Sequence, residues 1–441
     1  MKKKWYKSIF IICCILLIIV GIAGVIGYYF PITIGGKAIQ VKENLESNQI
    51  LSKEEIEEDR EQLIDLVESI HPAFVDGSDL STYEEAKNHY IQATDREMTV
   101  GEFRYETGAY LAALNDGHTR LWRADENTFE IWHKYTDGHM YYYRYDDGET
   151  VPTGLYVTEV NGVSIDKILD VIDYSVPAEN KYAREVNYND YFTSESVLKL
   201  AGVEISGDFV EVSLNDGSVE RCSYYVPKES NGNIDETGNR WKWDGEVFVV
   251  IFEECIRDEG FRDMVSELKK AVKNGCSKVI IDVRNNGGGN SDTCTELLEA
   301  MGMKAPEYGM MIRYSEEAKT QVGYLRTNGT YTYEPQNNGE ANPSIDLVVL
   351  YNKNTFSSAN MMCVYVRDGG LGVLIGEPCK NSPSHYGQPI EFSLEHSHLN
   401  GSISHKAFTR PNGDWSEKVL LPDVEMVGND SYQTAIDFLT Q

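Results

Sequence analysis

One stretch decides how this chain folds: Lys278-Val279-Ile280-Ile281-Asp282-Val283-Arg284-Asn285-Asn286-Gly287-Gly288-Gly289-Asn290. Its first half is a short apolar run of β-branched residues, which is typical of a strand buried on both faces. The glycines lead to Ser291-Asp292, which is expected to cap a helix over residues 293–301. A strand, a glycine loop and a helix in this order can present backbone N–H groups to an anion or to a developing oxyanion. A tight turn in which Asn-Gly supplies a positive φ angle explains the same residues equally well.

The composition is that of a globular protein with an acidic body. The chain has 441 residues, room for two or three domains, and is 41% hydrophobic and 25% charged. The net charge is −30. The first thirty residues contain four lysines and no acidic residue, so the remainder carries 36 basic against 70 acidic residues. So acidic a body argues against nucleic acid as a partner, since phosphate contact needs a basic face.

Residues 8–30 predict a membrane anchor. Residues 9–26 contain no charge and are long enough to span the roughly 30 Å hydrocarbon layer of a bilayer. Aromatic residues flank the run on both sides, and the lysines lie only on its N-terminal side. A cleaved signal peptide competes with this reading, but the run exceeds a normal signal core and no small-x-small site follows. We therefore expect residues 1–7 in the cytoplasm, a single-pass signal anchor, and the body outside the cell membrane.

Six cysteines lie beyond the anchor: Cys222, Cys255, Cys276, Cys294, Cys363 and Cys379. A core of this size does not need disulfide staples, so we expect mostly buried thiols. The chain contains neither a CxxC nor an HExxH motif, and we expect no metal site and no cofactor.

Residues 31–50 are expected to form a linker and residues 51–125 a helical region. A capping box at Ser52-Lys53-Glu54-Glu55 opens the first helix, and the last helix stops at Asn115-Asp116-Gly117. His118 follows at once, where a histidine is commonly a structural cap. From residue 126 to 240 the apolar period becomes that of strands, and Asn161-Gly162 is a strong hairpin signal. The pattern around this hairpin resembles part of a PDZ domain, although many hairpins share it.

Residues 241–441 alternate strands and helices, which implies helices packed over a parallel sheet. Within them, the buried strand 347–351 leads through a polar loop to Thr355-Phe356-Ser357-Ser358 and then to a helix. A serine between a buried strand and a helix sits where a nucleophile is commonly exposed, because the helix dipole lowers the cost of an alkoxide. The alternative is that Ser357 or Ser358 only caps the helix.

Four motifs occur in one order along the chain: Ile281-Asp282-Val283-Arg284-Asn285-Asn286-Gly287-Gly288-Gly289, Asn354-Thr355-Phe356-Ser357-Ser358-Ala359, Ile375-Gly376-Glu377-Pro378 and Leu421-Pro422-Asp423-Val424-Glu425. Together they resemble the tail-specific (C-terminal processing) and tricorn-core family of serine proteases. The likeness covers residues 245–430, with a further match at Asn115-Asp116-Gly117-His118-Thr119. It implies an α/β fold: a crotonase-like protease core built as a spiral of ββα units, an N-terminal helical cap and a PDZ-like β region, preceded here by one transmembrane helix.

The resemblance also implies roles for individual residues. Ser357 matches the nucleophile of the family, and the N–H groups of Gly289 and Ser358 match its oxyanion hole. Peptide cleavage needs a nucleophile, a base within hydrogen-bond reach and donors aimed at the tetrahedral oxyanion. The chain supplies these parts if the helical region folds back over the sheet.

The identity of the base separates two branches of the family. Processing proteases use a lysine after a Gly-Glu-Pro-Thr motif, but Ser382 stands at that position and Lys380 is two residues early. The tricorn-like branch uses the histidine of a Gly-His motif, which His118 matches. His385 is a further candidate, while the polar neighbours of Lys380 give little reason to expect its deprotonation. Glu417 is nearest to the glutamate that orients the histidine in tricorn-type enzymes, at a spacing one residue short.

The predicted function is therefore that of a membrane-anchored, extracytoplasmic serine endopeptidase that cleaves peptides or proteins. The alternative is a catalytically inactive relative that binds peptide tails as a scaffold or receptor. The presence of both Ser357 and His118 favours the enzyme. An esterase is a distant third, because the chain has no Gly-x-Ser-x-Gly elbow.

Overall fold

A computed structural model describes residues 21, 30–123, 127–146, 149–226 and 238–441 of the chain. The membrane anchor predicted at residues 8–30 lies outside the described residues except for two positions. Among the residues that are described, no helix combines the length and the apolar character needed to cross a membrane.

The stretch that opened the sequence analysis forms the middle of a six-stranded sheet. Its strands lie in the order β10 (Arg240–Asp244), β11 (Val247–Ile251), β12 (Lys278–Asp282), β15 (Asp346–Tyr351), β16 (Val373–Gly376) and β19 (Val424–Glu425). All neighbours are parallel except β10, which pairs antiparallel with β11 at the edge. The parallel sheet predicted from the alternation of strands and helices is therefore confirmed.

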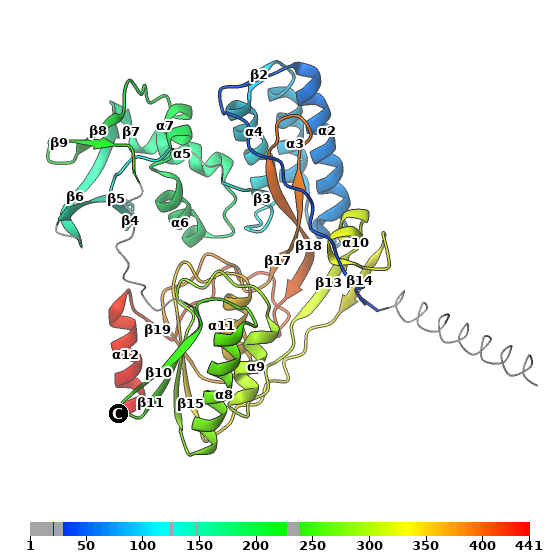
Figure 1. Ribbon diagram of the computed structural model, residues 1–441, viewed down its shortest axis with the longest axis vertical. Helices are drawn as coiled ribbons and strands as arrows, with labels where there is room; N and C mark the ends of the chain where they lie inside the picture. The colour runs from blue at the N-terminus through cyan, green and yellow to red at the C-terminus, as the bar shows by residue number, and fades with distance from the viewer. Residues whose placement is uncertain (1–20, 22–29, 124–126, 147–148, 227–237) are drawn as a thin grey trace, which may run out of the picture.

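Helices cover both faces of this sheet, which explains why its inner strands β11, β12 and β15 are largely apolar. On one face lie α8 (Glu259–Lys273), α9 (Asp292–Ala300) and α11 (Ser358–Gly369), and on the other lies α12 (Asn429–Thr440) (Figure 1). The helix expected after the glycine loop is α9. The capping bond expected from Ser291 is not made, because its backbone is already helical, with φ −64° and ψ −21°, instead of extended.

The N-terminal helices are α2 (Lys53–Ile70), α3 (Ser81–Ala93) and α4 (Val100–Ala112), with a short 3-10 turn at Pro72–Phe74 and a strand pair β1 (Ile50–Leu51) and β2 (Met98–Thr99). The expected capping box is present, with the Ser52 hydroxyl accepting from Glu55 N–H at 3.3 Å. These helices share one hydrophobic core with a second sheet. That sheet has the order β14 (Thr330–Tyr333), β13 (Gly309–Arg313), β18 (Asn400–Thr409) and β17 (His385–Ser393), and α10 (Glu316–Val322) lies between β13 and β14 in sequence. The shared core fastens the helical region to the C-terminal half (Figure 1).

Residues 129–224 form a separate region with its own core, called the β region below. Its antiparallel strands are β4 (His133–Thr136), β5 (His139–Asp146), β6 (Glu149–Val160), β7 (Val163–Ser164), β8 (Phe209–Leu214) and β9 (Val219–Ser223). The predicted hairpin joins β6 to β7, with positive φ at both Asn161 and Gly162. The segment expected to be rich in strands also contains α5 (Ile165–Ser175), α6 (Lys181–Tyr191) and α7 (Glu195–Leu200), which pack on the sheet.

The six cysteines outside the predicted anchor are free thiols, and all but Cys276 are buried. The expectation of mostly buried thiols is confirmed. Cys255 and Cys294 bring their sulfur atoms to 3.9 Å beneath the glycine loop.

Candidate active site

Ser357 stands on the turn between β15 and α11. It occupies the N-cap position of α11 with φ +53° and ψ −125°, a strained conformation that costs on the order of 1–3 kcal/mol and persists only where neighbours enforce it. Its N–H donates to Asn381 Oδ1 at 2.8 Å. Its side chain makes no capping bond to the helix, and the hydroxyl of Ser358 donates instead to Gly289 O at 2.7 Å. The reading of these serines as simple helix caps is therefore wrong.

The hydroxyl of Ser357 points at His118. The distance from His118 Nε2 to Ser357 Oγ is 3.0 Å, across 239 positions of sequence. His118 lies in the turn between α4 and β3 (Arg120–Leu121), and β3 pairs with β18, which brings this turn over the α/β core. The imidazole stacks on Phe356 with ring centroids 4.5 Å apart. The helical region thus folds back over the sheet, as the predicted pairing requires.

A buried carboxylate, Asp116, lies behind this imidazole. Its Oδ1 accepts the backbone N–H of His118 at 3.0 Å and lies 3.7 Å from His118 Nδ1. Its Oδ2 accepts from Thr119 Oγ1 at 2.6 Å and lies 3.3 Å from His71 Nε2. Burial alone would raise the pKa of Asp116, but interactions with His118 and His71 hold that pKa well below its usual range. In the sequence Asp116 is part of a turn, and its place two residues before a histidine is the only local signal of its role.

The glycine loop lies directly against the serine. Gly288 has φ +97°, and a Cβ atom added to it would lie 2.6 Å from Ser357 Cβ. The N–H of Gly288 donates to Asn286 Oδ1 at 2.8 Å, whereas no hydrogen bond among the described residues uses the N–H of Gly289 or of Ser358. The two N–H groups predicted to form the oxyanion hole therefore have no acceptor among the described residues.

A second acidic residue, Glu179, reaches the site from the loop between α5 and α6. Loss of hydration and repulsion from Asp116 raise the pKa of Glu179. Ligand atoms of Asp116, His118 and Glu179 lie within 4.8 Å of one another. Both oxygens of Glu179 already accept N–H hydrogen bonds, so this cluster is not an open set of metal ligands.

The two alternative bases lie beside the pair. Lys380 holds its Nζ 5.5 Å from the centre of the Phe356 ring, and burial lowers its pKa. The polar setting expected for Lys380 is thus wrong, because its side chain packs against an aromatic ring. The ring of His385 lies 5.8 Å from that of His118, and burial lowers its pKa to about 3, so it stays neutral. Of the three candidates, His118 is the one hydrogen-bonded to Ser357 in the described structure.

The structure does not bring Glu417 to the histidine. Its carboxylate forms an ion pair with Arg410, which also binds Asp368. Arg410 is 2% exposed, and a buried guanidinium needs such partners because an unpaired buried charge is costly. Asp116 occupies the position behind His118 that the sequence analysis gave to Glu417.

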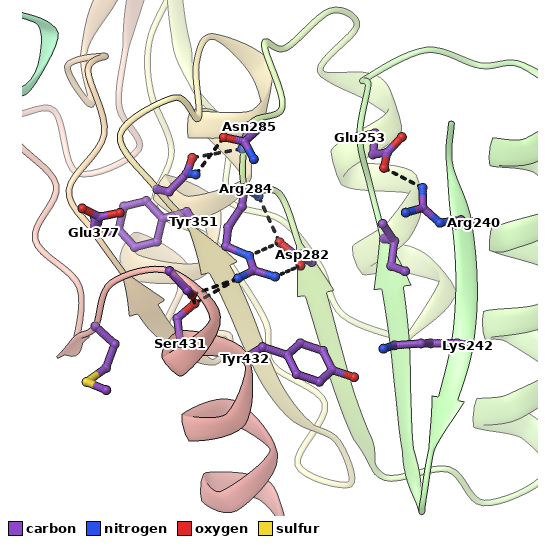
Figure 2. A pocket seen from close by; sticks show the side chains of 14 residues that line it. Arg240, Lys242, Glu253, Asp282, Arg284, Asn285, Tyr351, Glu377, Ser431 and Tyr432 are labelled. Atoms are coloured by element: carbon purple, nitrogen blue, oxygen red, sulfur yellow. Dashed lines mark hydrogen bonds and ion pairs between the residues drawn. The ribbon is translucent and has the colours of Figure 1, made fainter. Parts of the chain in front are cut away.

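A cavity of about 520 Å³ lies at the carboxyl ends of β11, β12 and β15, where ligands commonly bind in open α/β sheets. It is lined by Asn352 of the loop between β15 and α11 (residues 352–357, called the serine loop below) but not by Ser357. Figure 2 shows two ion pairs in it, Arg284 with Asp282 and Arg240 with Glu253. Arg284 also donates to Gly428 O and Ser431 Oγ at the start of α12. These groups satisfy each other and fix the end of the sheet next to the serine loop.

The α/β core, with a serine hydrogen-bonded to a histidine above it, has the arrangement that serine-type peptidases use. Residues 245–426 match the family model described as Peptidase family S41, a family of serine-type peptidases. No curated protein sequence matches the chain.

Solved structures of CPAF have a similar fold. The structure of mature CPAF complexed with lactacystin is 13% identical, covers 88% of this chain and 97% of its own, and has a TM-score of 0.57. A mutant of CPAF is 14% identical, with coverage of 88% and 96% and a TM-score of 0.58. At such identity these likenesses show the fold alone. The photosystem II D1 C-terminal processing protease aligns over 88% of this chain with a TM-score of 0.43, too low to bear on the fold.

Proposed function

We propose that the chain is a membrane-anchored, extracytoplasmic serine endopeptidase in which Ser357 forms an acyl-enzyme and His118 is the general base. One observation carries the proposal: the 3.0 Å contact between His118 Nε2 and Ser357 Oγ. This distance is within the range of ~2.6–3.2 Å over which a base takes a proton from a nucleophile. Histidine is also the side chain that most often serves as the general base in such proton transfers.

In the proposed mechanism His118 Nε2 accepts the hydroxyl proton while Ser357 Oγ attacks the scissile carbonyl carbon. Asp116 Oδ1 lies 3.7 Å from His118 Nδ1, too far for a hydrogen bond, and its negative charge stabilises the imidazolium that forms. The N–H groups of Gly289 and Ser358 receive the oxyanion, aided by the N-terminal end of α11. His118 then returns its proton to the leaving amine. In the second half, water attacks the acyl carbonyl carbon while His118 takes its proton, and His118 gives that proton to Ser357 Oγ as the acid product leaves.

The proposal places the chain in the histidine-using, tricorn-like branch, with a PDZ-like β region and a crotonase-like core. A cavity of about 550 Å³ between the β region and the core supports peptide substrates. It is lined by Trp132 and His133 on one side and by Lys353 and Asn354 of the serine loop on the other. A peptide lying in this cavity would approach Ser357 along the serine loop. The proposed membrane anchoring is supported by the apolar run at residues 9–26, which lies outside the described residues except for residue 21.

The full chain, purified in detergent and offered unstructured labelled casein, tests the chemistry. Ser357→Ala is expected to lower the rate by roughly four to six orders of magnitude, and His118→Ala by a comparable amount. Lys380→Ala and His385→Ala, checked for folding by melting temperature, are the controls. A fluorophosphonate probe should label Ser357 and not Ser358. Near-native turnover of His118→Ala would contradict the assignment of the base, and loss of activity in Lys380→Ala alone would move the chain to the lysine-using branch.

The location has a separate test. Protease added to intact cells should degrade the body of the chain and spare the anchor segment, because the lysine asymmetry orients the N-terminus inward. Full protection of the body in cells whose other outer-surface proteins are digested would contradict it.

A further inference from the structure

Glu179 belongs to the β region, yet its carboxylate contacts the site formed by the other two regions. The residue follows α5 and precedes α6. Its oxygens accept the backbone N–H of Gly117 at 3.1 Å and that of Ser382 at 2.7 Å. Each of the two oxygens also accepts a hydrogen bond from Asn381 Nδ2, at 3.0 Å. Every partner of this carboxylate in the described structure is an N–H donor.

The contact with Asn381 reaches the nucleophile. An asparagine amide has a donor end and an acceptor end, and its surroundings decide which way each end points. Because Glu179 holds the Nδ2 end, Oδ1 is left to accept the N–H of Ser357 at 2.8 Å. A flipped amide would present its NH₂ group to that N–H and lose the bond. Glu179 therefore fixes an acceptor that holds the strained backbone of Ser357.

The contact with Gly117 reaches the base. Gly117 directly precedes His118, and a Cβ atom on Gly117 would lie 3.0 Å from Glu179 Oε1 and 3.1 Å from the Phe356 ring. The same ring is the one on which the imidazole stacks. One carboxylate therefore touches the backbone next to His118 directly and the backbone of Ser357 through a single amide.

We propose that Glu179 is a positioning residue through which the β region sets the catalytic pair. This proposal rests on the proposed function of Ser357 and His118. Among the described residues Glu179 makes no hydrogen bond to either side chain of the pair, although its carboxylate lies within 4.8 Å of a ring nitrogen of His118; it orients the backbone that carries each of them. Docking of the β region thereby becomes a condition for a competent site.

The neighbouring residue shows what a purely structural link between the same regions looks like. Asn180 Nδ2 donates to Cys379 O at 3.3 Å and to Lys418 O at 3.0 Å, while its Oδ1 caps α6. It connects the β region to the core but has no hydrogen bond to Asn381, Gly117 or Ser357 in the described structure. Asn180→Ser keeps a capping oxygen and removes both donated bonds. This variant is the matched control for weakened docking without loss of the positioning contact.

Exchanging the acceptor role of Glu179 and the donor role of Asn381 tests the proposal. Glu179→Gln puts an NH₂ group against N–H donors, and Asn381→Asp puts two carboxylates together. The double variant Glu179→Gln/Asn381→Asp restores a donor facing an acceptor, leaves an oxygen for Ser357 N–H, and keeps the summed charge of the two residues. Glutamine at position 179 still offers one oxygen to Ser382 N–H, so the swap loses only the bond from Gly117.

The readouts are kcat and KM of the full chain on labelled casein, the labelling rate of Ser357 by a fluorophosphonate probe, and the melting temperature. We expect each single variant to lose about 100-fold in kcat with KM changed less than about threefold, since ~1 Å of misplacement has that effect. The double variant should regain about tenfold over either single one. Asn180→Ser should keep kcat within about threefold at a similar fall in melting temperature. Where Glu179→Gln fails to fold, Asn381→Asp and the double variant carry the same comparison.

Glu179→Gln with kcat near that of the wild type would overturn the proposal, and so would an Asn180→Ser variant that loses kcat equally, or a double variant without recovery. Ser357→Ala is measured alongside. If it is inactive while Glu179→Gln is unaffected, only the positioning role fails. If the wild type shows no hydrolysis that Ser357→Ala removes, both the proposed function and the positioning role fail.

Discussion

Replacing Gly288 by alanine perturbs the closest approach between the glycine loop and the nucleophile. The new Cβ would lie 2.6 Å from Ser357 Cβ and 2.9 Å from Ser358 N, whereas carbon atoms in contact normally stay ~3.5–4.0 Å apart. Relief therefore requires a shift of about 1 Å between the loop and the serine, and a shift of that size costs roughly 100-fold in rate. The corresponding increase in the activation barrier is ~2.8 kcal/mol. The φ of +97° at Gly288 adds backbone strain of ~1–2 kcal/mol to any residue with a Cβ.

The assay compares kcat/KM on labelled casein and the melting temperature of two alanine variants. Gly287→Ala is the matched control, because a Cβ at this position meets no heavy atom within 4 Å and Gly287 is not among the residues with positive φ. We expect Gly287→Ala to stay within about twofold of the wild type, since exposed substitutions of this kind change little. A Gly288→Ala variant that folds normally and keeps near-native kcat/KM would refute the reasoning.

Three further outcomes are expected. Asp116→Asn should lower kcat by ~10²–10⁴-fold through loss of the charge behind His118. Interactions with His118 and His71 hold the pKa of Asp116 well below 3.8, so its stabilising effect is present above pH 3.8 and is lost as the pH falls through the lowered pKa. The difference in melting temperature between variant and wild type should therefore shrink as the pH falls below 3.8. Burial lowers the pKa of Lys406 from 10.5 to about 8. In denaturant titrations, Lys406→Met should therefore raise the free energy of unfolding by up to ~3 kcal/mol at pH 7, and this gain should shrink as the pH rises from 8 to 10.5. A gain that does not depend on pH would contradict this cause. Alkylation in native buffer should leave Cys255 and Cys294 unmodified, because the hydrogen bond between them and burial hold the pKa of Cys294 well above its ordinary value. When the chain is then denatured without reduction, mass spectrometry should find both residues as free thiols.

The parallel sheet was predictable because its signals are local. Residues 279–283 carry their apolar character in adjacent positions, and the glycines that follow permit a backbone that other residues avoid. The turn that carries Ser357 was predictable for the same reason, since strand, loop and helix are neighbours in sequence, but the choice of Ser357 over Ser358 as the nucleophile came from the family resemblance. His118 needed a family resemblance, because nothing near it in sequence indicates a partner 239 positions away.

The acidic partners of the histidine were not predictable from sequence spacing. Glu417 was selected by its distance from a motif, but a buried guanidinium at Arg410 binds its carboxylate instead. Asp116 looks like an ordinary turn residue after α4, and its role depends on a fold that buries it beside His71. Glu179 has no local signal at all, because its partners come from two other regions of the chain.

The site is assembled from three bodies that each have their own hydrophobic core. His118 comes with the core of the N-terminal helices, Glu179 with the β region, and Ser357 with the α/β core. The helices that carry His118 share their core with a sheet of the C-terminal half, so docking of the β region is the step expected to limit the fraction of molecules with an assembled site. Mild heat or low denaturant would silence the enzyme while circular dichroism still reports a folded chain, and cooling would restore it.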